Sequence, residues 1–381
     1  MISFNKPYLA GKETVYISEA VKSMKISGDG IFTTKCNAFF QNRYGFKKCL
    51  LTTSCTDALE MAAILLNIVS GDEVIVPSYT FVSSANAFVL RGAKIVFCDS
   101  RDDHPGLDEE KIESLITSRT KVIVPVHYAG VACDMDKIMD LAKKYDLFVV
   151  EDAAQAIDSY YTGKDGIVKP LGSIGHLAAF SFHETKNIIS GEGGMLVIND
   201  EQFIERAEII REKGTNRSKF FRGEIDKYGW VDIGSSFLPS DIIAAFLFAQ
   251  LENIDEIQEK RKSIWNFYNQ ELQSLTQSGK IKTPIIPDYS ANNAHMFYLI
   301  CGDSHERSLL IKFLKSKGIN AVFHYLSLHK SEYYLKNNEL KNLRNTDVYA
   351  DCLIRLPFYF ELALSEQKLI VKLINEFYNQ N

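Results

Sequence analysis

The sequence predicts an α/β fold, in which a large domain with a mostly parallel seven-stranded sheet between helices precedes a smaller C-terminal α+β domain. Seven short apolar runs rich in Val and Ile lie between residues 49 and 199, and such runs are typical of strands covered on both faces. Segments with helical periodicity alternate with them, as in a mostly parallel sheet. The length of 381 residues allows two domains, which we place at residues 1–248 and 249–381.

Each expected element follows from its local pattern. We expect the strands of the sheet at 49–52, 73–77, 94–98, 121–126, 147–152, 177–182 and 195–199. We expect helices at 13–24, 32–44, 56–68, 83–90, 108–116, 135–145, 201–213 and 241–251. The polar stretch 214–219 predicts an exposed loop, and 294–301 and 319–325 predict strands of the second domain.

Composition and charge argue against several classes of protein function. The formal net charge is −5 and no basic block occurs, so we expect no nucleic-acid partner. No apolar run approaches the ~20 residues of a membrane span, and the N-terminus lacks the layout of a signal peptide. The seven cysteines include no C-x-x-C pair, which favours reduced thiols over disulfides or a zinc site. We therefore expect a cytoplasmic protein with no metal and no membrane partner.

Polar residues follow several of the expected strands. In parallel sheets the carboxyl ends of the strands form the ligand-binding rim, so these clusters are expected to share one cleft. They are Thr53–Asp57, Pro77–Phe81, Val126–Gly130, Glu151–Gln155 and Ser181–Lys186.

Lys186 follows the apolar run 177–182 and precedes the turn Gly191-Glu192-Gly193-Gly194. A lysine at the end of a buried strand costs free energy unless it has a task. A partly desolvated lysine can lose its proton and form a Schiff base with a carbonyl group. The alternative for this stretch alone is a solvated lysine beside a β-hairpin.

Three further features suit one cofactor. The hydroxyl-rich turn Ser54-Cys55-Thr56 opens a helix, where it is either an ordinary N-cap or a phosphate site. Tyr79 offers a flat ring, for packing or for stacking. Asp152 ends an apolar strand and needs a cationic partner, either an arginine or a protonated ring nitrogen. A phosphate turn, a ring, a buried carboxylate and a nucleophilic lysine are the set that pyridoxal phosphate requires.

The stretches 181–187 and 191–194, together with Val150-Glu151-Asp152-Ala153-Ala154-Gln155, resemble the sugar-nucleotide aminotransferases of the aspartate-aminotransferase fold. The resemblance continues from Pro77-Ser78-Tyr79-Thr80-Phe81 to Leu356-Pro357 and covers nearly the whole chain. It is strongest to transaminases that make dTDP-4-amino-4,6-dideoxygalactose for enterobacterial common antigen.

The resemblance implies a reaction and its partners. They are pyridoxal 5'-phosphate, which becomes pyridoxamine 5'-phosphate in the second half-reaction, L-glutamate as amino donor, and dTDP-4-keto-6-deoxyglucose as acceptor at C4. The galacto product is favoured, and the gluco epimer and a C3 aminotransferase stay open. A non-catalytic cofactor-binding regulator is disfavoured by the intact Lys186, Asp152 and Gln155. Lys186 also argues against the related 3-dehydratases, which carry histidine there, and no G-x-G-x-x-G motif supports a nicotinamide reductase.

The resemblance also implies roles for single residues. Lys186 and Asp152 are the expected catalytic pair. The expected cofactor ligands are Lys186, Asp152, Gln155, Tyr79, Ser54, Cys55, Ser181 and Ser236, and the expected substrate ligands are His324, Tyr325 and His183. Family members are homodimers with shared active sites. The usual partner element, Gly-x-Asn-x-Arg-Met, reads Gly234-Ser235-Ser236-Phe237-Leu238-Pro239 here, so Ser236 replaces Asn and Leu238 replaces Arg.

Overall fold

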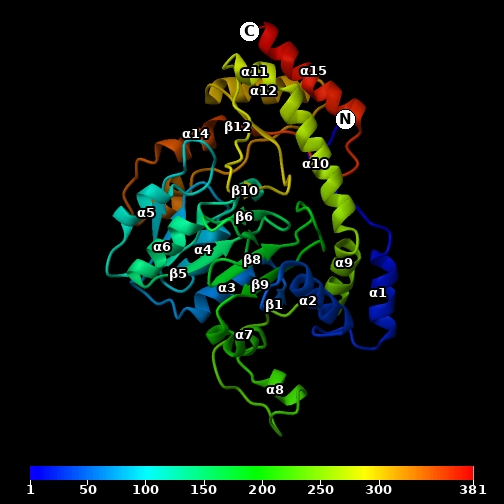
Figure 1. Cartoon of the computed structure of the whole chain (residues 1–381), viewed down its shortest axis with the longest axis vertical. Coiled ribbons are helices and arrows are strands. Elements are labelled where there is room, and N and C mark those ends of the chain that lie inside the picture. Colours follow the sequence, from blue (N-terminus) through cyan, green and yellow to red (C-terminus); the bar gives the residue numbers. More distant parts are fainter. Residues whose placement is uncertain (381) are drawn as a thin grey trace.

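The chain folds around a seven-stranded sheet that lies between two layers of helices (Figure 1). The computed structural model describes residues 1–380. The sheet order is β1-β9-β8-β5-β4-β2-β3, parallel from β8 to β3 and antiparallel at the β1–β9 and β9–β8 pairs. Its strands are β1 (Lys48–Thr52), β2 (Glu73–Pro77), β3 (Lys94–Cys98), β4 (Thr120–Ile123), β5 (Phe148–Asp152), β8 (Leu177–Ser181) and β9 (Gly194–Ile198). The predicted fold class and its seven strands are confirmed.

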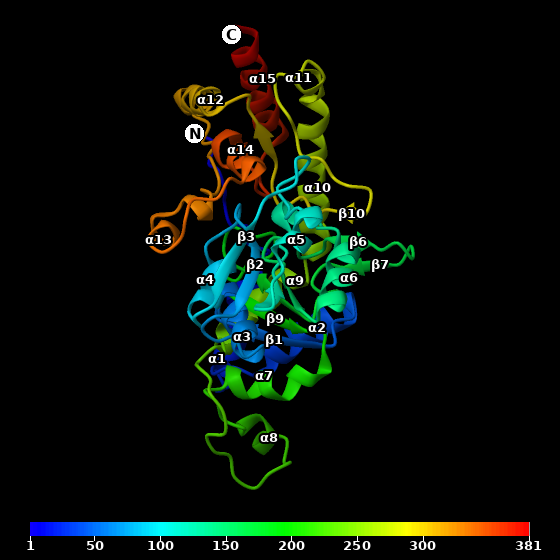
Figure 2. The same ribbon diagram turned by 90° about the vertical axis from the view of Figure 1, so that its left-hand side faces the viewer.

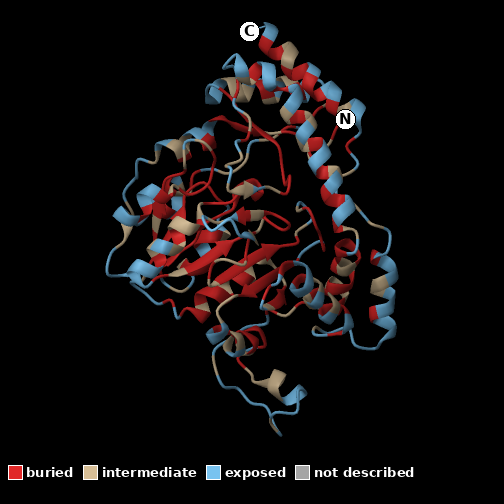
Figure 3. Ribbon diagram, in the orientation of Figure 1, coloured by how far each residue is buried: buried red, intermediate tan, exposed pale blue. Residues whose placement is uncertain are grey.

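Successive side chains of a strand point to opposite faces of the sheet, because a strand has a period of two. In β2, Ile75 joins one core cluster, and Val74 and Val76 join the other. Helices α2 (Ile31–Tyr44), α5 (Glu109–Leu115), α6 (Met135–Tyr145) and α9 (Asp241–Leu251) contribute to the first cluster. Helices α3 (Cys55–Leu65), α4 (Ser83–Val89) and α7 (Ile204–Arg211) contribute to the second. Figure 3 shows the sheet as the most deeply buried layer.

A small three-stranded antiparallel sheet, ordered β10-β6-β7, was not predicted. It consists of β6 (Tyr160–Thr162), β7 (Val168–Pro170) and β10 (Ser290–Ala291). These strands are two or three residues long, too short for a periodic apolar pattern to be visible. Their pairing brings Ser290 beside Tyr161 across a long sequence separation, which no local signal announces.

The C-terminal region packs helices on a two-stranded sheet of β11 (Tyr298–Ile300) and β12 (Leu353–Arg355). Its other elements are α10 (Ile254–Glu271), α11 (Gln273–Gln277), α12 (Ser304–Ser316), α13 (Glu332–Leu335), α14 (Arg344–Cys352) and α15 (Leu364–Gln380). The strand expected at 319–325 is wrong, since the segment makes only single bridges, one of which pairs Ile319 with Ile2. Helix α10 runs from the core of the large sheet into the C-terminal core, so a division at 248/249 stays a prediction.

The segment that follows α7 projects from the body of the molecule. Helix α8 (Arg217–Phe221) lies at the end farthest from the C-terminus (Figures 1 and 2). Several large apolar side chains of this arm are exposed, including Phe221, Tyr228 and Trp230, the last at 84%. Helix α1 (Glu13–Lys22), by contrast, packs along α9. Within residues 1–380, no helix is both long and apolar enough to cross a bilayer.

Candidate active site

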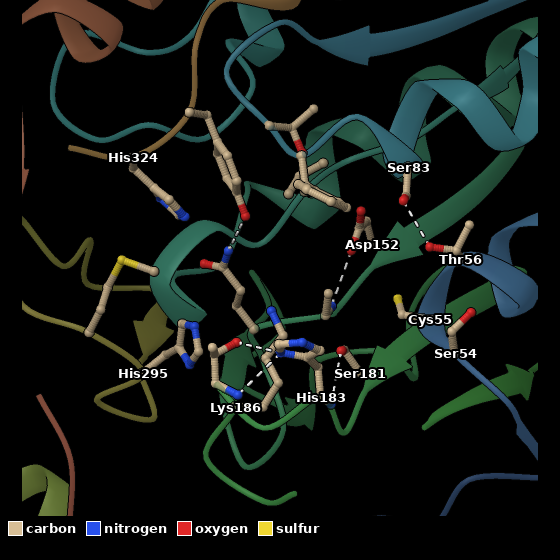
Figure 4. A pocket seen from close by; sticks show the side chains of 18 of the residues that line it. Ser54, Cys55, Thr56, Ser83, Asp152, Ser181, His183, Lys186, His295 and His324 are labelled. Atoms are coloured by element: carbon tan, nitrogen blue, oxygen red, sulfur yellow. Dashed lines mark hydrogen bonds between the residues drawn. The ribbon is translucent and has the colours of Figure 1, made fainter. Parts of the chain in front are cut away.

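A cavity of about 550 Å³ lies at the carboxyl ends of the parallel strands, where the C-terminal region meets the large sheet. Nine of the residues predicted for the site line it: Ser54, Cys55, Asp152, Gln155, Ser181, His183, Lys186, His324 and Tyr325. In Figure 4 the turn at Ser54 and Cys55 lies across the cavity from His324, and Asp152 lies between the two sides. The tertiary structure thus brings together residues that are separated by up to 271 positions (325 − 54).

Lys186 has the environment of a nucleophilic lysine. It follows the end of β8, and its backbone N–H donates to the carbonyl of His183 at 2.9 Å. Its ammonium group forms no ion pair or hydrogen bond with any of residues 1–380. Burial lowers the pKa of Lys186 below its ordinary value. Cys55 and Asp152 oppose this shift, and the positive charge of Arg355 adds a smaller lowering contribution. The neutral, nucleophilic amine is therefore more accessible here than on the surface.

Asp152 is a buried carboxylate that lacks an arginine partner. Its Oδ2 accepts a hydrogen bond from the Ser84 hydroxyl at 2.6 Å, and its Oδ1 accepts from the Ala154 N–H at 3.1 Å. Within the described chain no arginine pairs with it, which removes one of the two partners considered from the sequence. Burial raises the pKa of Asp152, and the hydrogen bond from Ser84 opposes that rise. A cationic group entering the cavity would stabilise the charged form.

The start of α3 is N-capped by Ser54 and lines the cavity. The Ser54 hydroxyl accepts from the Asp57 N–H at 3.0 Å, so it caps the helix. The positive end of the helix then faces the cavity through Cys55 and Thr56. A Cβ on Gly194 would stand 2.3 Å from the Ser54 carbonyl carbon, so only glycine lets β9 approach this turn. Burial raises the pKa of Cys55 well above its ordinary value, which keeps it a neutral thiol.

Gln155 is held in one orientation. Its Oε1 accepts from the Ala129 N–H at 2.6 Å, which leaves its amide Nε2 as the donor toward the cavity, where it contacts the Tyr325 hydroxyl at 3.1 Å. The His324 ring stacks on Tyr325 at 3.6 Å, and its Nδ1 lies 2.6 Å from the Tyr128 hydroxyl. This network joins the rim of the large sheet to the C-terminal region.

Tyr79 does not line the cavity, which contradicts its predicted role. Its ring is 1% exposed and packs against Tyr128, Tyr325 and Tyr349. Two residues later, Phe81 lines the cavity and is 55% exposed. The chain bends after β2, so that Tyr79 joins the junction between the two regions while Phe81 reaches the rim.

Sequence reasoning missed several other lining residues. Thr56 and Ser83 share a hydrogen bond of 2.8 Å at the start of α3. Thr56 belongs to the Ser54-Cys55-Thr56 turn but was not expected as a ligand, and Ser83 lies two residues after the Pro77–Phe81 cluster. His295 and Arg355 also line the cavity, but they come from the C-terminal region, where no motif marked them. Ser236 is exposed and lies outside the cavity of its own chain, so its contribution to a partner's site stays a prediction.

The residues present fit pyridoxal phosphate. A helix N-terminus with hydroxyl groups suits the phosphate, a buried carboxylate lacking a cation suits a protonated ring nitrogen, and an unpaired lysine suits the aldehyde. Phe81 offers a ring beside the same space. The fold and the cavity therefore define a pyridoxal-phosphate-dependent aminotransferase.

Comparison with known proteins supplies the family. The chain belongs to the DegT/DnrJ/EryC1/StrS aminotransferase family, whose model matches residues 7–375. It is 32% identical over 375 residues to GDP-perosamine synthase of Escherichia coli O157:H7, covering 98% of each chain. It is 33% identical over 347 residues to UDP-4-amino-4-deoxy-L-arabinose–oxoglutarate aminotransferase of Shewanella sediminis, covering 87% of each.

A solved structure agrees with these relatives. Spr1654 of Streptococcus pneumoniae, assigned as a sugar aminotransferase and solved in its PMP form, has a TM-score of 0.91 and 25% identity, with 100% of each chain covered. The chain is thus a sugar aminotransferase that depends on pyridoxal phosphate.

Proposed function

We propose that this aminotransferase moves the amino group of L-glutamate to C4 of dTDP-4-keto-6-deoxyglucose and yields the galacto epimer, as dTDP-4-amino-4,6-dideoxygalactose transaminases do. The observation that carries the proposal is that Lys186 and Asp152 line the same cavity as His324 and Tyr325. One pair of residues suits the cofactor, and the other pair lies in the same cavity, where a sugar can contact it. The motifs around Lys186 and Asp152 support this acceptor through the resemblance described above.

The chain's own residues have defined tasks in this proposal. Pyridoxal phosphate, when bound, supplies an electron-withdrawing ring and a carbon that carries the amino group between donor and acceptor. Asp152 holds the proton on the ring nitrogen, and Gln155 donates to the ring oxygen. Lys186, with its lowered pKa, moves a proton to and from the sugar C4. His183, His324 and Tyr325 orient the sugar hydroxyl groups.

A second acceptor class is favoured by a specific observation. Relatives of this chain at 32–34% identity are GDP-perosamine synthases, so a GDP-linked keto sugar is the main competitor of the dTDP-linked one. UDP-linked sugars follow from the Shewanella sediminis relative. The cavity residues named here contact the sugar ring in our proposal and do not choose among the nucleotides.

The test is a comparison of acceptors with one donor. The purified protein, loaded with pyridoxal phosphate, is incubated with L-glutamate and with the dTDP-, GDP- or UDP-linked 4-keto-6-deoxyhexose. Product formation is followed by chromatography, and the configuration at C4 is read by NMR. We expect the highest kcat/KM for the dTDP sugar and an axial 4-amino group. Preferred turnover of the GDP sugar, or an equatorial amino group, would replace the proposed acceptor or epimer.

A further inference from the structure

Arg355 is a cation in the cavity without an anion. It ends β12 and lines the cavity. One Nη donates to the Phe323 carbonyl at 3.3 Å, and the guanidinium lies over the Phe4 ring at 4.6 Å. Its Nε is buried and donates to nothing within the described residues. No Asp or Glu of residues 1–380 forms an ion pair with it.

This arrangement differs from that of most other arginines of the chain. Arg43, Arg101 and Arg211, for example, each pair with at least one carboxylate. The groups around Arg355 carry positive or no charge, and the positive charge of Arg355 contributes to lowering the pKa of Lys186 and of His324. Arg355 is therefore a cation that forms no ion pair with Asp152 or Glu192, the carboxylates that line the same cavity.

The guanidinium is also held in position. The Phe4 carbonyl accepts from the Phe358 N–H at 3.0 Å, and Ile2 pairs with Ile319, so the N-terminal segment is fixed to the C-terminal region. The Phe4 ring then supports one face of the Arg355 plane. With the plane fixed and one Nη on a carbonyl, the other Nη and the second N–H of the first can make a bidentate contact.

We propose that Arg355 binds the α-carboxylate of the amino donor. The inference rests on the proposed function as far as the donor is an amino acid. In an amino acid the carboxylate is bonded to the carbon that carries the reacting nitrogen, so it must lie beside Lys186. In a 4-keto sugar nucleotide the diphosphate is attached at C1, across the ring from the reacting carbon. Arg355 lines the same cavity as Lys186, which matches the first geometry.

The test separates the two half-reactions. The pyridoxal-phosphate form is mixed with L-glutamate, and the pyridoxamine-phosphate form is mixed with the keto sugar, each followed by cofactor absorbance. For Arg355→Met we expect the apparent second-order rate constant of the reaction with glutamate to fall roughly 10- to 100-fold. This is the usual loss for a hydrogen bond to a charged group. The keto-sugar half-reaction should change less than about threefold, and Arg355→Lys should recover part of the loss.

A matched control is available in the same region. Arg307 also donates one Nη to a carbonyl, that of Ala350 at 3.0 Å, and lies over an aromatic ring, that of Phe323, but it does not line the cavity. Arg307→Met should leave both half-reactions unchanged. Binding of maleate, a dicarboxylate without an amino group, is measured by calorimetry and should weaken only in the Arg355 variants.

Three results would overturn the assignment. They are an unchanged glutamate half-reaction in Arg355→Met, an equal loss in both half-reactions, or a loss confined to the keto sugar. Failure of the proposed acceptor looks different, because the wild-type pyridoxamine form would then not react with the dTDP sugar while glutamate conversion still depended on Arg355. When an amine without a carboxylate replaces glutamate, Arg355→Met should react with it as fast as the wild-type protein does. A comparable loss of rate with that amine would also contradict the proposal.

Discussion

At the scale of single residues, the site combines two buried groups whose charges the fold perturbs in ways that suit an incoming cofactor. Burial lowers the pKa of Lys186 and raises that of Asp152. Both shifts disfavour the charged forms in the cofactor-free protein. Each group is therefore stabilised when the bound cofactor supplies its partner. Lys186 and Asp152 therefore lower the free energy of unfolding of the cofactor-free protein.

The destabilisation caused by Lys186 can be measured as a function of pH. Because the folded state lowers the pKa of Lys186 below 10.5, the unfolded chain binds its proton more tightly, and stability rises with pH up to the ordinary lysine pKa. Lys186→Met should therefore stabilise the cofactor-free protein near neutral pH, by roughly 1–2 kcal/mol. The advantage should shrink as the pH approaches 10.5. Urea denaturation at several pH values measures it, with Lys341→Met on the exposed surface as control. A pH-independent difference would contradict the argument.

Phe81 and Tyr79 form a second comparison at this scale. Phe81 lines the cavity, whereas Tyr79 is buried in the tyrosine cluster. Phe81→Leu should weaken retention of pyridoxal phosphate by about 1 kcal/mol, the usual worth of an aromatic contact beyond its buried area. Tyr79→Leu, which removes that ring, should leave retention by the folded protein unchanged. Equilibrium dialysis of the cofactor distinguishes the two, and the reverse order of effects would restore Tyr79 as the stacking ring.

At the scale of elements, the phosphate side of the site depends on the close approach of β9 to the start of α3. The Cβ built on Gly194 lies 2.3 and 2.4 Å from backbone atoms of Ser54 and Cys55, distances that no rotamer change can relieve. We therefore expect the helix N-terminus, and not the serine side chain alone, to bind the phosphate.

Gly194→Ala should separate these two elements. We expect destabilisation of roughly 1–3 kcal/mol, the range for overpacking a well-packed core, and weaker binding of pyridoxal phosphate. The control is Gly229→Ala, because a Cβ there meets no heavy atom within 4 Å. Thermal unfolding and cofactor titration measure both effects. Normal cofactor affinity in a folded Gly194→Ala protein would show that the turn does not cradle the phosphate.

At the scale of the whole molecule, the exposed arm around α8 and the exposed Ser236 suit a homodimer with shared sites, as the family resemblance implies. Trp230 is 84% exposed in the single chain, and large exposed apolar groups often mark interfaces. Ser236 lies outside the cavity of its own chain, although the Phe237 carbonyl next to it accepts from the Thr53 N–H at 3.0 Å.

Subunit complementation tests this arrangement. Lys186→Ala is mixed with a variant in which the exposed Ser235 and Ser236 are both replaced by bulky residues, and the subunits are exchanged. Heterodimers should regain activity, because one of the two sites then has an intact lysine and an intact partner segment. Ser236→Ala alone should weaken cofactor retention by about 1 kcal/mol, the net worth of one hydrogen bond. An active monomer, or no recovery after verified exchange, would mean that each chain builds its own site.

The strands of the large sheet and the residues next to them were predictable because their signals are local. The apolar runs at 73–77 and 148–152 are contiguous and buried. Asp152 ends such a run, Ser54 and Lys186 follow one within a few residues, and parallel strands bring their carboxyl ends to one rim. The sequence by itself therefore determined the fold class, the rim and the residues that suit the cofactor.

What only the tertiary structure decided arises from contacts between distant segments. Tyr79 and Phe81 are two aromatic residues of one turn, and the bend of the chain settles which of them faces the cavity. Arg355 stands out only once Phe4, Phe323 and Lys186 surround it, because an unpaired charge is a property of a residue's neighbours. A local pattern specifies periodicity and burial, whereas the balance of charge in a cavity depends on every element that lines it.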